Sequence, residues 1–220
     1  MPAQPTIPAA IASLYPAVAS VHFSRKIPPE AKLLPAELEI TSGMVEKRRT
    51  EFRHGRYCAR TAMQQLGVAP AAIAKGPDRE PVWPSGIIGS ITHTGSAAAA
   101  VVAKSTDLAA LGLDMELTEP LTADLISMIC LPEENPDKDG TRGKLLFSIK
   151  ESIYKCLFPL INEYVDFLEM EVVLEEATMT FSARPRAARL DSKLIKSLQG
   201  RYIYQSGFVI SAAWINKSST

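Results

Sequence analysis

Apolar positions recur at helical spacing between residues 44 and 67, and this is the clearest periodic pattern in the chain. Val45 and Phe52 fall on one face of such a helix. Ser42 is suited to cap its N-terminus, and Gly67 is suited to follow its last turn because glycine tolerates the left-handed conformation found there. The pattern therefore predicts one long amphipathic helix.

Segments with strand character come next, after a loop at residues 68–90 that is dense in glycine and proline. Residues 90–94 and 97–103 are joined by Gly95-Ser96, which predicts a β-hairpin. Residues 108–117 are apolar apart from two carboxylates and predict a further strand. The loop is longer than most connections inside compact domains, and loops of that length often carry function.

The rest of the chain contains the same mixture of elements. Residues 147–158 predict a second helix that Pro159 stops, and residues 121–130 predict a shorter one. The other expected elements are an edge strand at 18–23, strands at 169–174, 178–183, 202–204 and 208–214, and a helical or irregular stretch at 187–199.

Helices and strands alternate on both sides of a seam near Pro120, which predicts an α/β or α+β fold. We expect two halves of similar length, an N-terminal half at 1–119 and a C-terminal half at 120–220, that together form one protein. No internal sequence repeat relates the two halves. Any relation between them is therefore expected to be structural.

Composition narrows the classes of protein that fit. Of 220 residues 46% are hydrophobic, and 24 basic side chains balance 24 acidic ones. A chain without net charge lacks the long-range attraction of a general nucleic-acid or membrane-surface binder. The longest apolar run, at 97–103, is far shorter than the roughly 20 residues of a membrane span. Neither nucleic acid nor a membrane is therefore an expected partner.

The cysteines and the N-terminus bear on the compartment. Three cysteines are scattered without disulfide-framework or zinc spacing, and residues 1–5 have no basic region of a secretory signal. We therefore expect a cytoplasmic protein with reduced thiols. Since two halves inside one chain need no second copy, a monomer is the expected state.

The most informative short motif is Gly-Leu-Asp-Met-Glu at 112–116. On a strand Asp114 and Glu116 project to the same side, where two carboxylates raise each other's pKa unless a cation lies between them. Oxygen ligands favour a hard ion such as Mg²⁺, and Mn²⁺ also accepts them. The alternative is an ordinary polar face of an edge strand, which the apolar flanks make less attractive.

The helix at 147–158 carries Lys150, Glu151 and Lys155 among apolar residues. An ordinary explanation is a Glu151–Lys155 pair on a solvated face, worth about 0.2–0.5 kcal/mol. A functional explanation makes Glu151 a third metal ligand or a general base and turns both lysines toward phosphates. Helix patterning alone favours the ordinary explanation.

Two further clusters are suggestive. Arg49, Arg53, Arg56 and Arg60 form a basic stripe on the first helix, with Arg48 beside it, and few acidic residues lie nearby. Such a stripe is usually solvated, but arginine forks also suit phosphate oxygens.

The second of these clusters is the Gly-Ser-Ile-Thr-His-Thr segment at 89–94, in which hydroxyl groups flank His93. A lone histidine more often has a structural role than a ligand. The dinucleotide and P-loop fingerprints are absent from the sequence.

Taken together, four segments resemble one family. They are RRTEFRHGRYCAR (48–60), KGPDREPVWPSGIIGSITHT (75–94), GLDME (112–116) and FSIKESIYKCLFP (147–159). Their order and spacing resemble the 4′-phosphopantetheinyl transferases, and most nearly the enterobactin-synthase component D type within the surfactin-type group. Met115 and Phe147 depart from common family residues without removing chemistry.

The resemblance implies an activity and a fold. Family members transfer the phosphopantetheine arm of coenzyme A to a serine of an acyl or peptidyl carrier protein and release 3′,5′-ADP. Their fold is a pseudo-dimer of two similar α/β halves with the site between them. Fatty-acid, polyketide and nonribosomal-peptide carriers are all compatible, and the branch tilts the expectation toward siderophores or other secondary metabolites.

The resemblance also implies roles for individual residues. Asp114, Glu116 and Glu151 match the Mg²⁺ site. Glu151 is also our candidate general base, and Lys150 or Lys155 is expected to assist the leaving phosphate. Coenzyme A is expected to contact Arg48, Arg56, Lys75, Gly76, Pro77, Asp78, Ser90, Thr92, His93, Lys150 and Lys155.

Three questions remain open at this level. Residues 121–131, with Met128 and Ile129, are expected either to dock the carrier protein or to pack into the core. A Mg²⁺-dependent nuclease or phosphodiesterase built on Asp114 and Glu116 is an alternative enzyme class. A non-catalytic nucleotide- or carrier-binding module is an alternative of another class, but it predicts a lost carboxylate or lysine, and none is lost.

Overall fold

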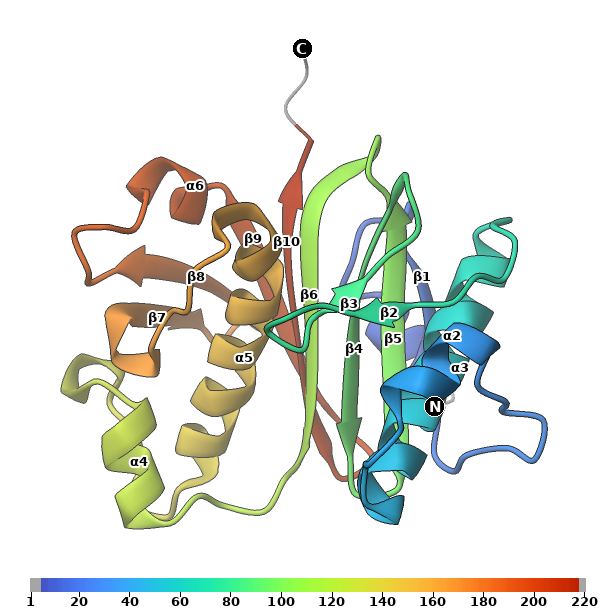
Figure 1. The fold of residues 1–220 in the computed structure, drawn as a ribbon. Coiled ribbons are helices and arrows are strands. Elements are labelled where there is room, and N and C mark those ends of the chain that lie inside the picture. The colour runs from blue at the N-terminus through green and yellow to red at the C-terminus, as the bar shows by residue number, and fades with distance from the viewer. Residues whose placement is uncertain (1–4, 218–220) are drawn as a thin grey trace.

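The computed structural model describes residues 5–217, so residues 1–4, on which the signal-peptide argument partly rests, lie outside the described residues. Two sheets stand side by side between two long helices, α3 (Glu46–Gln65) and α5 (Thr141–Ile161), as Figure 1 shows. The predicted mixed α/β class is confirmed. No helix within residues 5–217 is both long and apolar enough to cross a membrane.

The first sheet has three antiparallel strands in the order β1-β5-β4, and α3 packs on it. The elements of this half are α1 (Ile7–Ala12), β1 (Ser20–Ser24), α2 (Pro35–Ile40), α3, β2 (Ala74–Lys75), β3 (Pro81–Val82), β4 (Ile87–Thr94) and β5 (Ala97–Lys104). The predicted edge strand and hairpin are confirmed, with Gly95 at φ +56° in the turn. Val45, not Ser42, precedes the first residue of α3.

The second sheet has five antiparallel strands in the order β6-β10-β9-β8-β7. Its elements are β6 (Leu108–Leu117), α4 (Ala123–Ile129), η1 (Pro132–Glu134), α5, η2 (Phe167–Glu169), β7 (Met170–Glu175), β8 (Thr180–Pro185), α6 (Ser192–Lys196), β9 (Leu198–Gln205) and β10 (Phe208–Asn216). Strand β6 pairs with β10, so it lies in the second sheet, whereas the boundary expected at residue 119 assigns it to the first half.

Helix α5 differs from its prediction at both ends. It begins at Thr141, six residues before the predicted start, and it continues past Pro159 to Ile161. Proline is tolerated there because it removes a backbone donor only in the last turn, and Asn162 then ends the helix at φ +52°.

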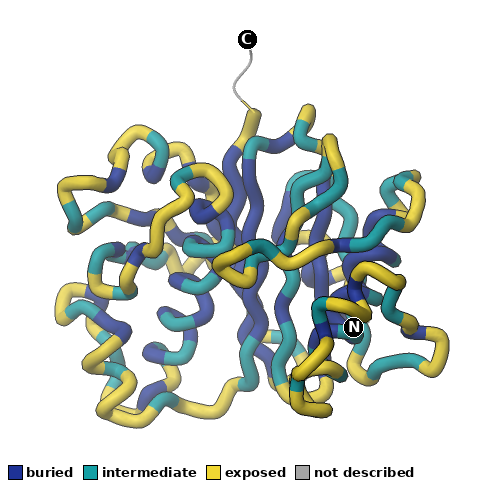
Figure 2. Tube along the Cα trace, viewed as in Figure 1, coloured by how far each residue is buried: buried dark blue, intermediate teal, exposed yellow. Residues whose placement is uncertain are grey.

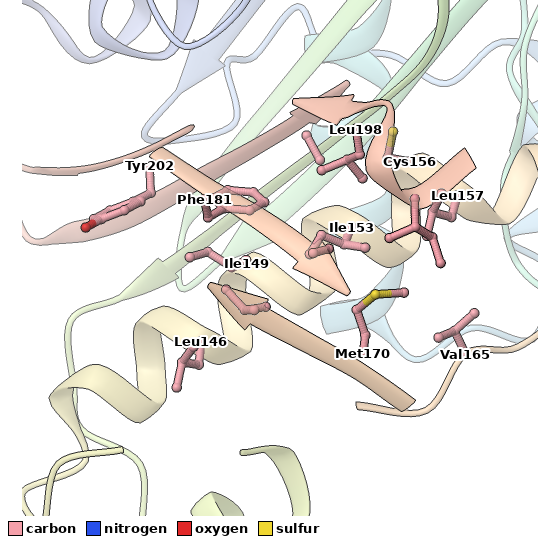
Figure 3. Packing of buried hydrophobic residues seen from close by; sticks show 14 of the residues in the cluster. Leu146, Ile149, Ile153, Cys156, Leu157, Val165, Met170, Phe181, Leu198 and Tyr202 are labelled. Atoms are coloured by element: carbon pink, nitrogen blue, oxygen red, sulfur yellow. The ribbon is translucent and has the colours of Figure 1, made fainter. Parts of the chain in front are cut away.

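The core of the second half lies between α5 and its sheet. Ile149, Ile153 and Leu157 follow one face of the helix and meet Met170 and Phe181 from β7 and β8, as Figure 3 shows. A stripe at this spacing fixes which side of α5 is buried. The opposite side of the same turns of α5 faces the seam between the two halves.

Strand β5 is buried on both faces. Its residues Ala98 and Ala100 pack under α3, while Ala99 and Val101 pack against the second sheet. Figure 2 shows β5, and β10 in the second sheet, as traces that are buried along nearly their whole length. Small side chains allow this close stacking, which explains why 97–103 is an unbroken apolar run and not an alternating one.

Strands β4 and β6 meet at the seam without a shared backbone ladder. The Ser90 hydroxyl accepts a hydrogen bond from the Leu113 amide at 3.0 Å, and the Thr92 hydroxyl accepts one from the Met115 amide at 3.2 Å. Both hydroxyls are buried. Two side chains of β4 thus satisfy two amides on the edge of β6 that has no ladder partner among the described strands.

Candidate active site

A cavity of about 580 Å³ opens at the seam, a size typical of small-molecule sites. Its walls come from the first turn of α3, the turn between β2 and β3, strands β4 and β6, and one face of α5. The lining residues are Arg48, Asp78, Arg79, Glu80, Pro81, Trp83, Gly89, Ser90, Ile91, Thr92, His93, Asp114, Glu116, Phe147, Glu151, Tyr154, Lys155, Phe158, Pro159 and Asn162.

Asp114 is a buried carboxylate in the wall of this cavity. Its Oδ1 accepts hydrogen bonds from Lys155 Nζ at 2.6 Å and from Thr92 Oγ1 at 3.3 Å. Its Oδ2 is buried and has no hydrogen-bond partner among the described residues. A buried carboxylate oxygen without a donor is costly unless a cation or proton from outside the chain meets it.

Gly112 explains how β6 comes so close to α5. A Cβ atom at this position would lie 2.0 Å from the Ser152 carbonyl oxygen and 2.7 Å from the Cys156 nitrogen. Gly112 therefore lets the strand touch the backbone of the helix. Because Gly112 and Asp114 share one face of the strand, Asp114 is carried directly to Lys155.

Glu116 lies next along the same face of β6. Burial, followed by the charge of Asp114, raises the pKa of Glu116 to about 7. Lys144 Nζ is 3.7 Å from Glu116 Oε2 and opposes this shift without cancelling it. The two carboxylates therefore lack sufficient positive charge from the protein alone.

Glu151 and Lys155 share the side of α5 that faces the cavity. Lys155 Nζ is 3.9 Å from Glu151 Oε2. Burial raises the pKa of Glu151, with Lys155 acting in the opposite direction. Burial by itself lowers the pKa of Lys155, but Asp114 and Glu151 outweigh it and raise the pKa, so the ammonium stays charged.

Arg48 and His93 form the wall on the other side of the cavity. Arg48 Nη1 is 2.8 Å from His93 Nε2 and 3.2 Å from Glu51 Oε2. Burial lowers the pKa of His93, so its ring accepts the Arg48 hydrogen bond in the neutral form. Ile91 and His93 face α3, where Gly55 leaves the room that Ile91 occupies.

The prediction that Lys150 faces phosphates is wrong for this structure. Its ammonium group is buried on the opposite side of α5, where it donates to Glu134 Oε2, Ile129 O and Phe167 O, each at 2.8 Å. Five residues separate it from Lys155, which turns the two side chains to different faces of the helix. Lys150 is therefore a structural cation.

Arg56 does not line the cavity either. Its guanidinium lies 4.2 Å from the Phe52 ring and donates to the Ile73 carbonyl at 2.8 Å and the Ala74 carbonyl at 3.1 Å. Arg56 thus supports the strand that carries Lys75. Burial lowers the pKa of Arg56 to about 10, which leaves it charged near neutral pH.

The loop at 75–78 is only partly at the cavity. Asp78 lines it, but the residues before it, 75–77, do not. Ser90 and Thr92 also line the cavity, but both hydroxyls are hydrogen-bonded to amides of β6. They are therefore not free to bind a ligand.

Sequence reasoning missed part of the cavity wall: Lys144 beside Glu116, and the lining residues Arg79, Glu80, Trp83, Tyr154 and Phe158. Trp83 alone had a local signal, because a tryptophan in a loop rich in proline and glycine needs an apolar partner. Trp83 packs against the apolar cluster between α3 and the first sheet, and Gly89 leaves room for its ring, since a Cβ there would lie 2.4 Å from it.

The predicted three-carboxylate metal site is not assembled here. Within residues 5–217 no three His, Cys, Asp or Glu side chains are placed to hold a metal ion together. The reason is Lys155, whose ammonium contacts both Asp114 and Glu151. The donors at Asp114 and Glu116 nevertheless fit a hard cation, because they are oxygens only, one is without a partner, and the Glu116 pKa is raised.

Two family matches together cover about three quarters of the chain. Residues 35–103 match the 4′-phosphopantetheinyl transferase N-terminal domain, and residues 110–210 match the 4′-phosphopantetheinyl transferase superfamily. The junction between the two matches falls before β6, in agreement with the pairing of β6 in the second sheet.

Individual relatives give the same result. The chain is 34% identical to 4′-phosphopantetheinyl transferase PptT of Mycobacterium tuberculosis over 84% of this chain and 87% of that protein. It is also 34% identical to 4′-phosphopantetheinyl transferase Svp of Streptomyces mobaraensis, over 84% of this chain and 79% of that one. Enterobactin synthase component D of Salmonella typhi matches at 32% over only 50% of this chain and 48% of that protein.

The branch expected from the motifs is therefore corrected, because the enterobactin-type relative is more distant than PptT and Svp. The family itself decides against the nuclease, phosphodiesterase and binding-module alternatives. This chain belongs to the 4′-phosphopantetheinyl transferase superfamily, enzymes that transfer phosphopantetheine from coenzyme A to carrier proteins.

Proposed function

We propose that the cavity at the seam is where this enzyme holds coenzyme A and receives the carrier serine. Arg48 and His93 hold phosphate at one end, and Lys155 contacts the pyrophosphate at the other. The cavity size and the placement of cations on two opposite walls support this assignment.

Asp114 and Glu116 are proposed to hold Mg²⁺ or Mn²⁺, with Glu151 as the third carboxylate in reach of the same region. Such an ion supplies positive charge that neutralises the pyrophosphate as its bond breaks. The partnerless Oδ2 of Asp114 and the raised pKa of Glu116 support the assignment, since both indicate missing positive charge.

Glu151 is proposed to act as the general base, directly or through water. The serine Oγ forms a bond to the phosphorus that carries the pantetheine, and its proton passes to Glu151. The bond from that phosphorus to the bridging oxygen breaks, and 3′,5′-ADP leaves with the electron pair. A buried carboxylate with a raised pKa is better matched to accepting a proton near neutral pH than a solvated one.

Lys155, and not Lys150, is proposed to stabilise the departing phosphate. Lys155 lies at the cavity and stays charged, whereas the burial of Lys150 removes it from any ligand in this cavity. The choice between the two lysines, which the sequence left open, thus rests on the face of α5 that each occupies.

The carrier protein is proposed to dock beside α4. Leu125 and Met128 are 42% and 65% exposed, so this part of 121–131 is free for a partner, whereas Ile129 is buried in the core. Carrier proteins of fatty-acid, polyketide or peptide assembly are all candidates. The enterobactin-type relative makes a siderophore carrier one of the first to try.

The convergence of Asp114 and Lys155 at 2.6 Å on the cavity carries this proposal. We would incubate apo carrier protein with the enzyme, coenzyme A and Mg²⁺ and follow the intact mass of the carrier. The expected result is the gain of one phosphopantetheine arm, lost when EDTA removes the metal.

The site assignment is tested by Glu151→Gln in the same assay. We expect this variant to bind coenzyme A and fail to transfer. Glu175→Gln is a matched control, because this exposed glutamate at the end of β7 lies outside the cavity. Unchanged turnover by Glu151→Gln would remove Glu151 from both of its proposed roles.

A further inference from the structure

Tyr15, which follows α1, contacts the strand of the metal-binding carboxylates although it lies far from them in sequence. Its hydroxyl donates to the Gly112 carbonyl at 2.5 Å. Tyr15 is buried in the cluster between the two sheets, with its ring centroid 6.0 Å from that of Trp214. The residue is therefore fixed in position by the apolar core on that side of β6.

The same glycine is pressed from the other side by α5. The close approach of Gly112 to Ser152 and Cys156 leaves no room for a Cβ atom there. Gly112 thus lies between the Tyr15 hydroxyl on one face of the sheet and the turn of α5 that presents Glu151 and Lys155 on the other. Asp114 follows two residues later on the face toward α5.

We infer that Tyr15 is a positioning residue for the metal-binding carboxylates, which it holds in place through Gly112. The inference rests on the proposed role of Asp114 and Glu116. Burial raises the pKa of Tyr15 well above its ordinary value, so the hydroxyl remains a donor at all working pH values. Loss of a group that hydrogen-bonds a metal ligand directly changes metal affinity about 10–100-fold, and because Tyr15 acts through the backbone two residues away, we expect the lower end of that range.

The N-terminal segment is anchored independently of this contact. Arg201 donates to the Ser13 carbonyl at 3.1 Å, and Gln205 donates to the Pro5 carbonyl at 3.0 Å. Removing only the Tyr15 hydroxyl therefore leaves the segment attached to β9. The effect of the hydroxyl on β6 is separable from the docking of α1.

The test is Tyr15→Phe, which keeps the ring and removes the donor. Mn²⁺ binding to the enzyme without coenzyme A would be measured by electron paramagnetic resonance, at a temperature where near-ultraviolet circular dichroism shows the variant folded. We expect about tenfold weaker Mn²⁺ binding and a lower kcat, with the KM for coenzyme A unchanged.

Two controls separate positioning from general stability. Tyr202→Phe removes a hydroxyl from a buried tyrosine of β9, and Leu14→Ala loosens the segment that carries Tyr15 without touching the Tyr15 hydroxyl. Leu14→Ala is expected to lower Tm because it removes buried apolar contacts, and both variants are expected to keep Mn²⁺ binding at the wild-type level. If Tyr15→Phe also lowers only Tm, or if Leu14→Ala weakens Mn²⁺ binding equally, the inference is overturned.

Asp114→Asn shows whether the metal assignment itself holds. Wild-type Mn²⁺ binding by that variant contradicts the proposed function, whatever Tyr15→Phe does. Lost binding in Asp114→Asn combined with full binding in Tyr15→Phe contradicts only the inference about Tyr15.

Discussion

Each half of the molecule contains a buried ion pair whose glutamate is the last residue of a Leu-Pro-x-Glu motif, at residues 34–37 and 131–134. In the first half Glu37 accepts hydrogen bonds from the Leu34 and Ile73 amides and pairs with Arg60 at 2.6 Å. Its side chain is fully buried. Helix α3 supplies the cation.

In the second half Glu134 accepts hydrogen bonds from the Leu131 and Val172 amides, at 2.7 Å each, and pairs with Lys150 at 2.8 Å. Helix α5 supplies this cation. In both halves one buried carboxylate therefore contacts three parts of the chain. These are a short turn, a distant strand or loop, and the long helix. The agreement relates the halves more closely than their sequences indicate.

Each long helix places one cation in the interior of its own half and another at the cavity. Arg60 and Lys150 are fixed inside their own halves, whereas Arg48 and Lys155 reach the cavity between them. The halves differ in the strand beside the cavity, because only β6 brings Asp114 and Glu116. The two carboxylates at the cavity therefore come from one half only, although both halves contain the same buried ion pair.

The largest effect is expected at the cavity-facing lysine. Lys155→Met removes the ammonium that contacts Asp114, and we expect transfer to fall about 10²–10³-fold, as for a lost electrostatic contact in other active sites. Single-turnover mass spectrometry of the carrier protein measures it. Lys150→Met is the matched comparison, and its folded fraction should transfer at a nearly normal rate. Equal loss in both variants would break the distinction between the two lysines.

The paired buried cations should matter for stability instead. Lys150→Met and Arg60→Met each leave a buried glutamate without its partner, at a cost of about 3–5 kcal/mol in the free energy of unfolding. Urea denaturation measures it. Replacing both partners, as in Glu134→Leu with Lys150→Met, should recover part of the loss. A cost below about 1 kcal/mol would contradict the equivalence of the two ion pairs.

Glu116 offers a pH test, because unlike Glu37 and Glu134 it is incompletely paired. Its folded pKa of about 7 exceeds the ordinary 4.5, so between these values the folded state holds a proton that the unfolded state has released. Stability of the metal-free enzyme should therefore fall by about 2–3 kcal/mol as pH rises from 4.5 to 7. Glu116→Gln should flatten this dependence, as urea denaturation across that range would show.

Glu39→Gln, at an exposed position, is the control and should keep the wild-type slope. Since a bound cation replaces the proton on Glu116, Mg²⁺ affinity should rise over the same pH range. A wild-type slope in Glu116→Gln would show that another group carries the pH dependence.

The smallest effect is expected at the seam. Thr92→Val removes the hydroxyl that bonds to the Met115 amide and to Asp114, and the cost is expected to be about 1–2 kcal/mol. Thr180→Val, on β8 and away from the cavity, should be close to neutral. Differential scanning calorimetry of the two variants checks the difference, and equal values would argue against a role of the hydroxyl in joining the sheets.

Local signals predicted much of this molecule. Strand β6 has the bounds that its apolar pattern gave, and the β4–β5 hairpin follows from Gly95-Ser96. Burial of β5 on both faces was visible as an unbroken apolar run. The carboxylates of β6 were located because alternation on a strand places them on one side.

The faces of α5 were not predictable in the same way. Lys150 and Lys155 are both cations among apolar residues, and only the position of Glu134 decides which one is buried. Each of these glutamates also binds one distant amide, which lies 38 residues after Glu134 and 36 residues after Glu37. Such long-range partners leave no local pattern, and the Leu-Pro-x-Glu repeat is too short to stand out in the sequence.

Strand β5 has a consequence for how the enzyme folds. Each of its faces is completed by a different half, so separation of the halves would expose the face that is formed by Ala97, Ala99, Val101 and Ala103. We therefore expect the chain to unfold in a single cooperative transition although two family matches divide it. A fragment ending at residue 105 should aggregate and not fold, because its central strand would present a bare apolar face to water.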